Sequence, residues 1–127
     1  MPAQHSFDYT IIRVVPHVER QEFINAGVIL FCKSLNFLDA CIDFELKRLQ
    51  TLTADADLRM IREHLNTISQ ICAGGENAGY FKEMSQAERF HWLSAPSSTI
   101  IQTSPVHCGL CTDPREALER LYRLLVL

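Results

Sequence analysis

Four polar side chains lie close together in residues 15–28, VPHVERQEFINAGV: Glu19, Arg20, Glu22 and Asn25. A guanidinium binds forked acceptors such as carboxylate and phosphate, and carboxylates close in sequence are its nearest partners. The stretch connects two apolar runs that have the composition of buried strands. The pattern therefore concentrates charge in a connection, the part of a fold that often carries function.

Arg13 lies inside the apolar run that precedes this stretch. In a regular strand its side chain shares a face with the apolar residues two positions away. The nearest carboxylates in sequence are Glu19 and Glu22. Two interpretations stay open: Arg13, Arg20 and these carboxylates form an ion-pair network that fixes a hairpin, or they line a pocket or partner surface for a small charged ligand.

A second group is His107 followed by the pair Cys108 and Cys111. A structural zinc site usually takes four ligands from two such pairs, and only one is present. A thioredoxin-like thiol lies at a helix N-terminus, whereas the next helix is expected to begin after Asp113. We therefore predict no metal site and no cofactor, with two unpaired thiols near a turn. The sequence also lacks the common nucleotide-loop, nucleophile-elbow and zinc-protease motifs.

Length and composition indicate one globular domain over residues 1–127. A chain of 127 residues with 47% hydrophobic and 21% charged residues has enough apolar surface for one core. The net charge of −3 makes nucleic acid an unexpected partner, because phosphate binding normally needs a basic excess. Short apolar runs, an N-terminus without a signal-peptide pattern and an odd number of cysteines, five, predict a cytoplasmic protein without disulfides or membrane spans.

The residues that carry this chemistry are expected on strands and at their ends. Residues 7–15, 23–32 and 37–44 are rich in β-branched and aromatic residues and have short connections, which predicts a three-strand antiparallel meander. Gly27 inside the second run indicates a bulge or a close approach of another group. A fourth strand is expected at residues 99–103.

Three helices are expected between and after these strands. Apolar residues recur at three- and four-residue steps over residues 58–72, Ser85 and Glu88 form a capping-box pattern, and Asp113 followed by Pro114 predicts the start of the last helix. The order βββααβα predicts a single α+β domain, a mostly antiparallel sheet with helices packed on one face. The other face is then solvated, covered by a partner, or used in binding.

The chain resembles a bacterial family known as domain of unknown function 3037. The resemblance is carried by RVVP at residues 13–16, ERQEFINAGV at 19–28, WLSAP at 92–96 and QTSPVH at 102–107, in the same order over nearly the whole chain. Ser97 stands where the family pattern has an arginine. The positions that match the motifs are Arg13, Glu19, Arg20, Glu22, Asn25, Gly27, Gln102, Ser104 and His107.

Family members resemble short cytoplasmic proteins often encoded beside a larger protein with a HipA-like kinase fold. The resemblance therefore implies an accessory or binding protein that pairs with such a partner through the uncovered sheet face or the charged connection, and it carries over no enzymatic activity. The alternative hypothesis is a small enzyme acting on a nucleotide- or phosphate-bearing substrate, with His107 or Glu22 as acid/base and Arg20 as anion clamp. Homo-oligomerisation is left open.

Overall fold

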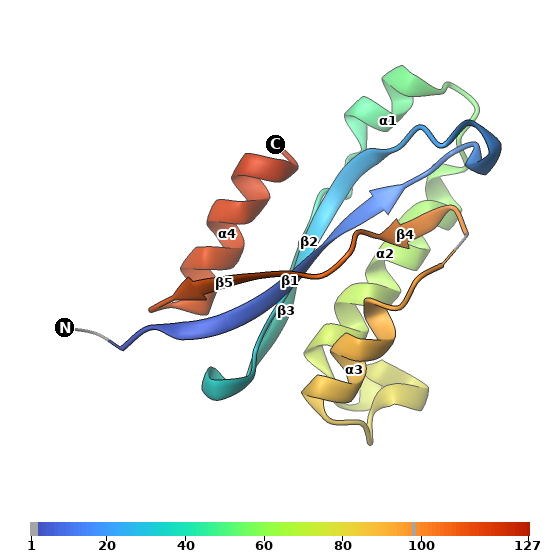
Figure 1. Cartoon of the computed structure of the whole chain (residues 1–127). Helices are drawn as coiled ribbons and strands as arrows, with labels where there is room; N and C mark the ends of the chain where they lie inside the picture. The colour runs from blue at the N-terminus through green and yellow to red at the C-terminus, as the bar shows by residue number, and fades with distance from the viewer. Residues whose placement is uncertain (1–2, 98) are drawn as a thin grey trace.

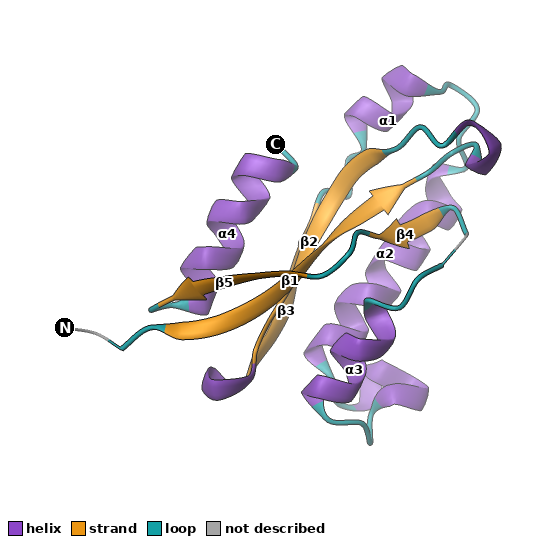
Figure 2. Cartoon of the chain, in the orientation of Figure 1, coloured by secondary structure: helices purple, strands orange, loops and turns teal. Residues whose placement is uncertain are grey.

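One antiparallel sheet organises the fold (Figures 1 and 2). The computed structural model describes residues 3–97 and 99–127. Within these residues the sheet has five strands in the order β3-β2-β1-β4, and β5 also pairs with β1. The strands are β1 (His5–Val14), β2 (Ile24–Cys32), β3 (Phe37–Ile42), β4 (Ile101–Thr103) and β5 (His107–Cys111).

The predicted meander is formed by β1, β2 and β3, and Gly27 lies where β2 departs from regular pairing. The register between β1 and β2 shifts at this point, because Ile12 pairs with Gly27 while Arg13 pairs with Asn25. A Cβ atom at Gly27 would lie 2.7 Å from the backbone oxygen of Cys41 on β3. Both expectations for this glycine, a bulge and a close approach, are confirmed.

Strands β4 and β5 lie end to end along the same edge of β1, separated by Ser104, Pro105 and Val106. Ser104 is buried and continues the ladder across the break. Its N–H donates to the carbonyl of Ile11 at 2.8 Å, and its hydroxyl oxygen accepts from the N–H of Ile11 at 2.8 Å. The hydroxyl of Thr10 donates to the Ser104 carbonyl at 2.6 Å. These bonds satisfy backbone groups that Pro105 would otherwise leave without partners.

Three of the helices begin at side-chain caps, two of which, Ser85 and Asp113, were predicted. Asp57 accepts from the N–H of Met60, Ser85 and Glu88 form a reciprocal capping box, and Asp113 accepts from the N–H of Arg115. The helices are α1 (Lys47–Leu52), α2 (Leu58–Ala73), α3 (Gln86–Leu93) and α4 (Pro114–Leu125). Within the described residues, none of them is long and apolar enough to cross a membrane.

The helices cover both faces of the sheet, which differs from the predicted one-face arrangement. On β2, Ile29 packs against α1, α2 and α3, whereas Val28 and Leu30 pack against α4. Figure 1 shows α4 on one side of the sheet and α2 and α3 on the other. The difference arises because neighbouring β2 residues point to opposite faces and are apolar on both, so each face needs its own cover.

The α+β class, the single antiparallel sheet and the order of the predicted elements are confirmed. Besides short 3-10 helices, two elements of the described residues were not predicted, the six-residue helix α1 and strand β5. Helix α1 follows Leu46, a buried residue in the left-handed conformation at φ 58°. Leucine rarely adopts this conformation, so no local sequence pattern predicts the start of this helix. Strand β5 contains Gly109, over which the Phe7 ring packs so closely that a Cβ atom there would lie 2.5 Å from it.

Candidate functional site

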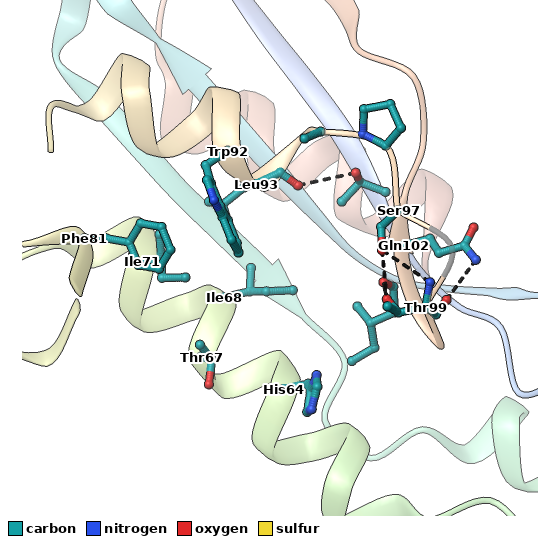
Figure 3. A pocket seen from close by; sticks show the side chains of 14 residues that line it. His64, Thr67, Ile68, Ile71, Phe81, Trp92, Leu93, Ser97, Thr99 and Gln102 are labelled. Atoms are coloured by element: carbon teal, nitrogen blue, oxygen red, sulfur yellow. Dashed lines mark hydrogen bonds between the residues drawn. The ribbon is translucent and has the colours of Figure 1, made fainter. Parts of the chain in front are cut away.

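An apolar groove lies between α2, α3 and β4 (Figure 3). Its volume is about 610 Å³, within the range of ligand-binding clefts. Its lining residues come from α2, α3 and β4, from the 3-10 helix η3 (Glu76–Phe81) and from the loop before β4. They include Thr67, Ile68 and Ile71 of α2, Phe81 of η3, Trp92 and Leu93 of α3, Ala95, Pro96, Ser97 and Thr99 of the loop, and Ile101, Gln102 and Thr103 of β4.

Helix α3 positions the aromatic wall of the groove. Its capping box sets the start of the helix, and Phe90 and Leu93 are buried in the core. With this face fixed, Trp92 points outward and its residue is 56% exposed. The Phe81 ring packs edge-on against it, with ring centroids 4.6 Å apart. A large aromatic side chain held in place but half open to solvent is typical of a binding surface.

Strand β4 forms the opposite wall and is the last strand on its side of the sheet. Ile101 and Thr103 pair with Val14 and Ile12, so their side chains share the face that carries α2 and α3. The Thr103 hydroxyl donates to the carbonyl of Leu93 at 3.4 Å, which connects this wall to the end of α3. Strand β4 is therefore held by backbone pairing with β1 on one side and by the Thr103 hydrogen bond to the end of α3 on the other.

A second apolar hollow of about 310 Å³ continues the groove toward the charged connection. It shares His64, Thr99 and Ile101 with the first hollow and adds Met60 of α2 and Val18. Among the described residues that line the two hollows, His64 is the only one with a titratable side chain. The lining thus favours uncharged, apolar groups.

The predicted charged cluster lies beyond this end of the groove, in the turn around the 3-10 helix η1 (Val18–Arg20). The Arg20 Nε atom lies 2.5 Å from a carboxylate oxygen of Glu22, and their side chains are 67% and 44% exposed. The imidazole of His17 lies 4.0 Å from a carboxylate oxygen of Glu19. These residues form two solvent-facing pairs around a small hollow of about 220 Å³ that His17, Arg20 and Glu22 help to line.

Arg13 joins neither pair and lies on the α4 face of the sheet. Its guanidinium carbon lies 4.3 Å from the centroid of the Phe23 ring, a cation–π contact. Asn25 and Gln102 are its cross-strand neighbours on either side. Asn25 donates its side-chain N–H to the carbonyl of Leu125 at 3.0 Å, so it holds the end of α4. The single network of Arg13 with Arg20 and the two glutamates is not formed.

His107 lies far from the charged turn, so the structure does not bring them into one site. It pairs with Tyr9 across β1 and β5, and the two rings are 5.3 Å apart. The turn follows Val14, five residues further along β1, which corresponds to about 17 Å. Ser104, also predicted for the site, is buried between β4 and β5 and makes its backbone bonds with Ile11 of β1.

The cysteines do not form a reactive pair. Cys108 is exposed and its thiol donates to Asp8, which raises the pKa of Cys108 above its usual value. Cys111 is buried with Cys32 in the core under α4, and burial raises its pKa. A redox thiol requires the opposite shift. In the described residues, no three His, Cys, Asp or Glu side chains lie close enough together to hold a metal ion.

The groove itself was not predicted, although parts of its lining carried the family resemblance. Trp92 lies in the WLSAP segment, and Gln102 in QTSPVH. The one signal for the groove in the sequence was Trp92. Adjacent residues of a helix point in different directions, so Trp92 cannot lie on the same buried face as Leu93. The remaining lining comes from α2, whose outer side chains reach β4 only through the tertiary fold.

Comparisons with known proteins give one match. A family model described as "Protein of unknown function (DUF3037)" matches residues 9–126. No curated protein and no solved structure matches the chain. The matched range includes all five strands except the start of β1, all four helices and every residue of the groove described above.

Proposed function

The chain belongs to the DUF3037 family, as the motifs in its sequence predicted, and we propose that it is an accessory protein that binds a larger protein partner through the apolar groove. The observation that supports this most is Trp92, an aromatic side chain that packs edge-on against Phe81 and is 56% exposed beside a hollow of about 610 Å³ whose described lining residues include no acidic or basic one other than His64. Surfaces of this kind are enriched at the centres of protein interfaces.

The charged turn extends this surface at its Val18 end. Val18 lines the second hollow, and Arg20 and Glu22 follow directly in the same turn. An apolar centre bordered by a solvated charged rim is the usual organisation of a protein interface. A larger protein with a HipA-like kinase fold is the first partner to test, and we propose that the pair acts in the bacterial cytoplasm, which agrees with the five free cysteines.

The test places a bulky charge in the groove without touching the core. Thr67 is an exposed α2 residue on the groove wall, and its hydroxyl donates to the carbonyl four residues earlier at 3.1 Å. Thr51 of α1 is its matched control, because it is also exposed and donates to the carbonyl four residues earlier at 3.2 Å. The chain is co-expressed with a protein of HipA-like kinase fold, and the affinity of the purified pair is measured for both Thr→Arg variants.

We expect Thr67→Arg to weaken the pair at least about tenfold, because a desolvated guanidinium in an uncharged hollow has no acceptor. Thr51→Arg should bind like the wild-type chain. Equal affinities of the two variants would show that the groove is not the interface. Turnover of a phosphoester by the monomeric chain alone would favour the enzymatic alternative instead.

A further inference from the structure

We propose that the groove accepts its partner as one extended segment that adds to β4 as a further strand, with apolar side chains at alternate positions. This inference rests on the proposed function and specifies the chemistry of what is bound. It depends on two features of the described residues, the direction of the β4 backbone groups and the position of the two hollows.

The backbone groups of β4 alternate between β1 and the open edge. Ile100 accepts from the N–H of Val15 at 2.6 Å, and the N–H of Ser104 donates to Ile11 at 2.8 Å. In an antiparallel pair, N–H and C=O of one residue point to the same side and alternate along the strand. Residues 100, 102 and 104 therefore face β1, while Ile101 and Thr103 direct their N–H and C=O groups away from it.

Beyond β4 the sheet has no further strand in residues 3–97 and 99–127. The carbonyl of Ile101 accepts from the Thr99 hydroxyl at 2.7 Å, a bond that a flexible side chain can release. An added strand would form its main-chain bonds with Ile101 and Thr103. This is the mode in which an extended peptide joins an open sheet edge, with affinity from the backbone and specificity from pockets for alternate side chains.

The two hollows lie on the side to which such alternate side chains would point. Residues opposite Ile101 and Thr103 would share their face, the one that carries α2 and α3. Side chains two positions apart on a strand are separated by about 6.5–7 Å. The hollows of about 610 and 310 Å³ are adjacent and meet at Ile101 and His64. Each can therefore take one of two side chains at positions i and i+2.

The chemistry of the lining defines those side chains. Because His64 is the only titratable group among the described lining residues, a charged side chain would enter without a fixed counter-charge. The inferred ligand is thus an extended segment with uncharged, aliphatic or aromatic residues at i and i+2 and a polar residue between them. A helical ligand would present its apolar residues at i, i+3 and i+4 instead.

The probe is an acetylated and amidated nonapeptide with leucine at its fourth and sixth positions, threonine elsewhere and a lysine at each end. Trp92, the only tryptophan of the chain, reports binding by fluorescence. A second peptide carries its leucines at the fourth and seventh positions, the helical spacing. A third has the spacing of the first, with both leucine amides N-methylated so that they no longer donate.

On the protein, Thr103→Pro removes an N–H that points to the open edge and leaves the bonds from β4 to β1 intact. Thr103→Val is the matched control, since it keeps that N–H and removes only the hydroxyl that donates to Leu93. Circular dichroism and thermal unfolding establish that both variants fold. The N-methylated peptide tests the same bonds on the wild-type chain, so the result does not depend on the proline variant.

We expect saturable binding of the first peptide, weakened about tenfold by N-methylation, by the helical spacing and by Thr103→Pro, and unchanged in Thr103→Val. Strand addition is wrong if the helically spaced peptide binds equally well, if neither N-methylation nor Thr103→Pro has an effect, or if no peptide gives a saturable signal. It is also wrong if the chain forms dimers that Thr103→Pro dissociates, because the occupant is then a second copy. Loss of the kinase-fold pair in Thr67→Arg but not in Thr103→Pro would retain the proposed function and reject only this inference.

Discussion

At the scale of single residues, the charged turn shows that charged residues close together in the sequence need not form one binding site. Glu19, Arg20 and Glu22 are close in the sequence and stay close in the structure, but as solvated pairs. Arg13 projects from β1 onto the other face and contacts Phe23, an arrangement that depends on how the chain returns after the turn. The identity of these residues predicted that they interact with charges, and only the fold decided which of them meet.

Arg20→Ala separates the two roles that this turn can have. The pair with Glu22 is largely exposed, and such pairs contribute about 0–1 kcal/mol, so we expect the free energy of unfolding to change by less than about 1 kcal/mol. We also expect weaker binding of the proposed kinase-fold partner, because Arg20 lies in the same turn as Val18. Urea denaturation and the affinity of the purified pair are measured on the same preparation. A loss of about 3–5 kcal/mol would instead identify a buried structural pair.

At the scale of elements, local signals predicted what local interactions determine. Ser85 with Glu88 and Asp113 with Pro114 mark helix starts through bonds within one turn, and both helices begin there. Strand β5 was missed because its pairing with β1 is non-local. The groove was missed for the same reason, since Ile68 and Thr103 face each other across it although they are distant in the sequence.

The capping box of α3 predicts a pH dependence. Bonds from the backbone and side chain of Ser85 lower the pKa of Glu88 below its ordinary value. A carboxylate with a lowered pKa in the folded state stabilises the protein above its unfolded pKa, and this contribution is lost as the pH falls through the folded pKa. The difference in unfolding free energy between wild type and Glu88→Ala should therefore be constant near neutral pH and shrink on acidification below about pH 4.5.

Urea denaturation followed by Trp92 fluorescence measures this effect, because Trp92 lies on the same helix. Glu83→Ala removes a nearby exposed carboxylate outside the capping box and is the control. A difference for Glu88→Ala that does not change with pH, or one that Glu83→Ala reproduces, would contradict the assignment to the cap.

At the scale of the whole molecule, β1 and β2 contribute to both cores. Ile12 and Ile29 pack under α2 and α3, while Phe7 and Leu30 pack under α4. The sequence predicted one domain and a sheet with helices on one face. It did not predict that α4 covers the second face, because the apolar residues of α4 are compatible with packing on either face. Strands shared in this way couple the two cores, so the loss of one should destabilise the other.

Leu118→Ala tests this coupling from the side opposite Trp92. Leu118 is a fully buried residue of α4, and truncation of such a leucine costs about 2–5 kcal/mol. We expect the unfolding transition seen by Trp92 fluorescence to shift together with that seen by circular dichroism. Leu124→Ala, on the same helix at a residue that is 71% exposed, should change stability by less than about 0.5 kcal/mol. A Trp92 transition that stays unchanged in Leu118→Ala would mean that the two sides unfold independently.

The break between β4 and β5 also bears on aggregation. A long, regular outer strand exposes a continuous row of backbone donors and acceptors on which other chains can stack without limit. Here the outer neighbour of the ten-residue β1 is divided into two strands, β4 of three residues and β5 of five. Pro105, between these two strands, has no backbone N–H. On this side of the sheet, the described residues thus offer two short outer strands in place of one long template for pairing with other chains.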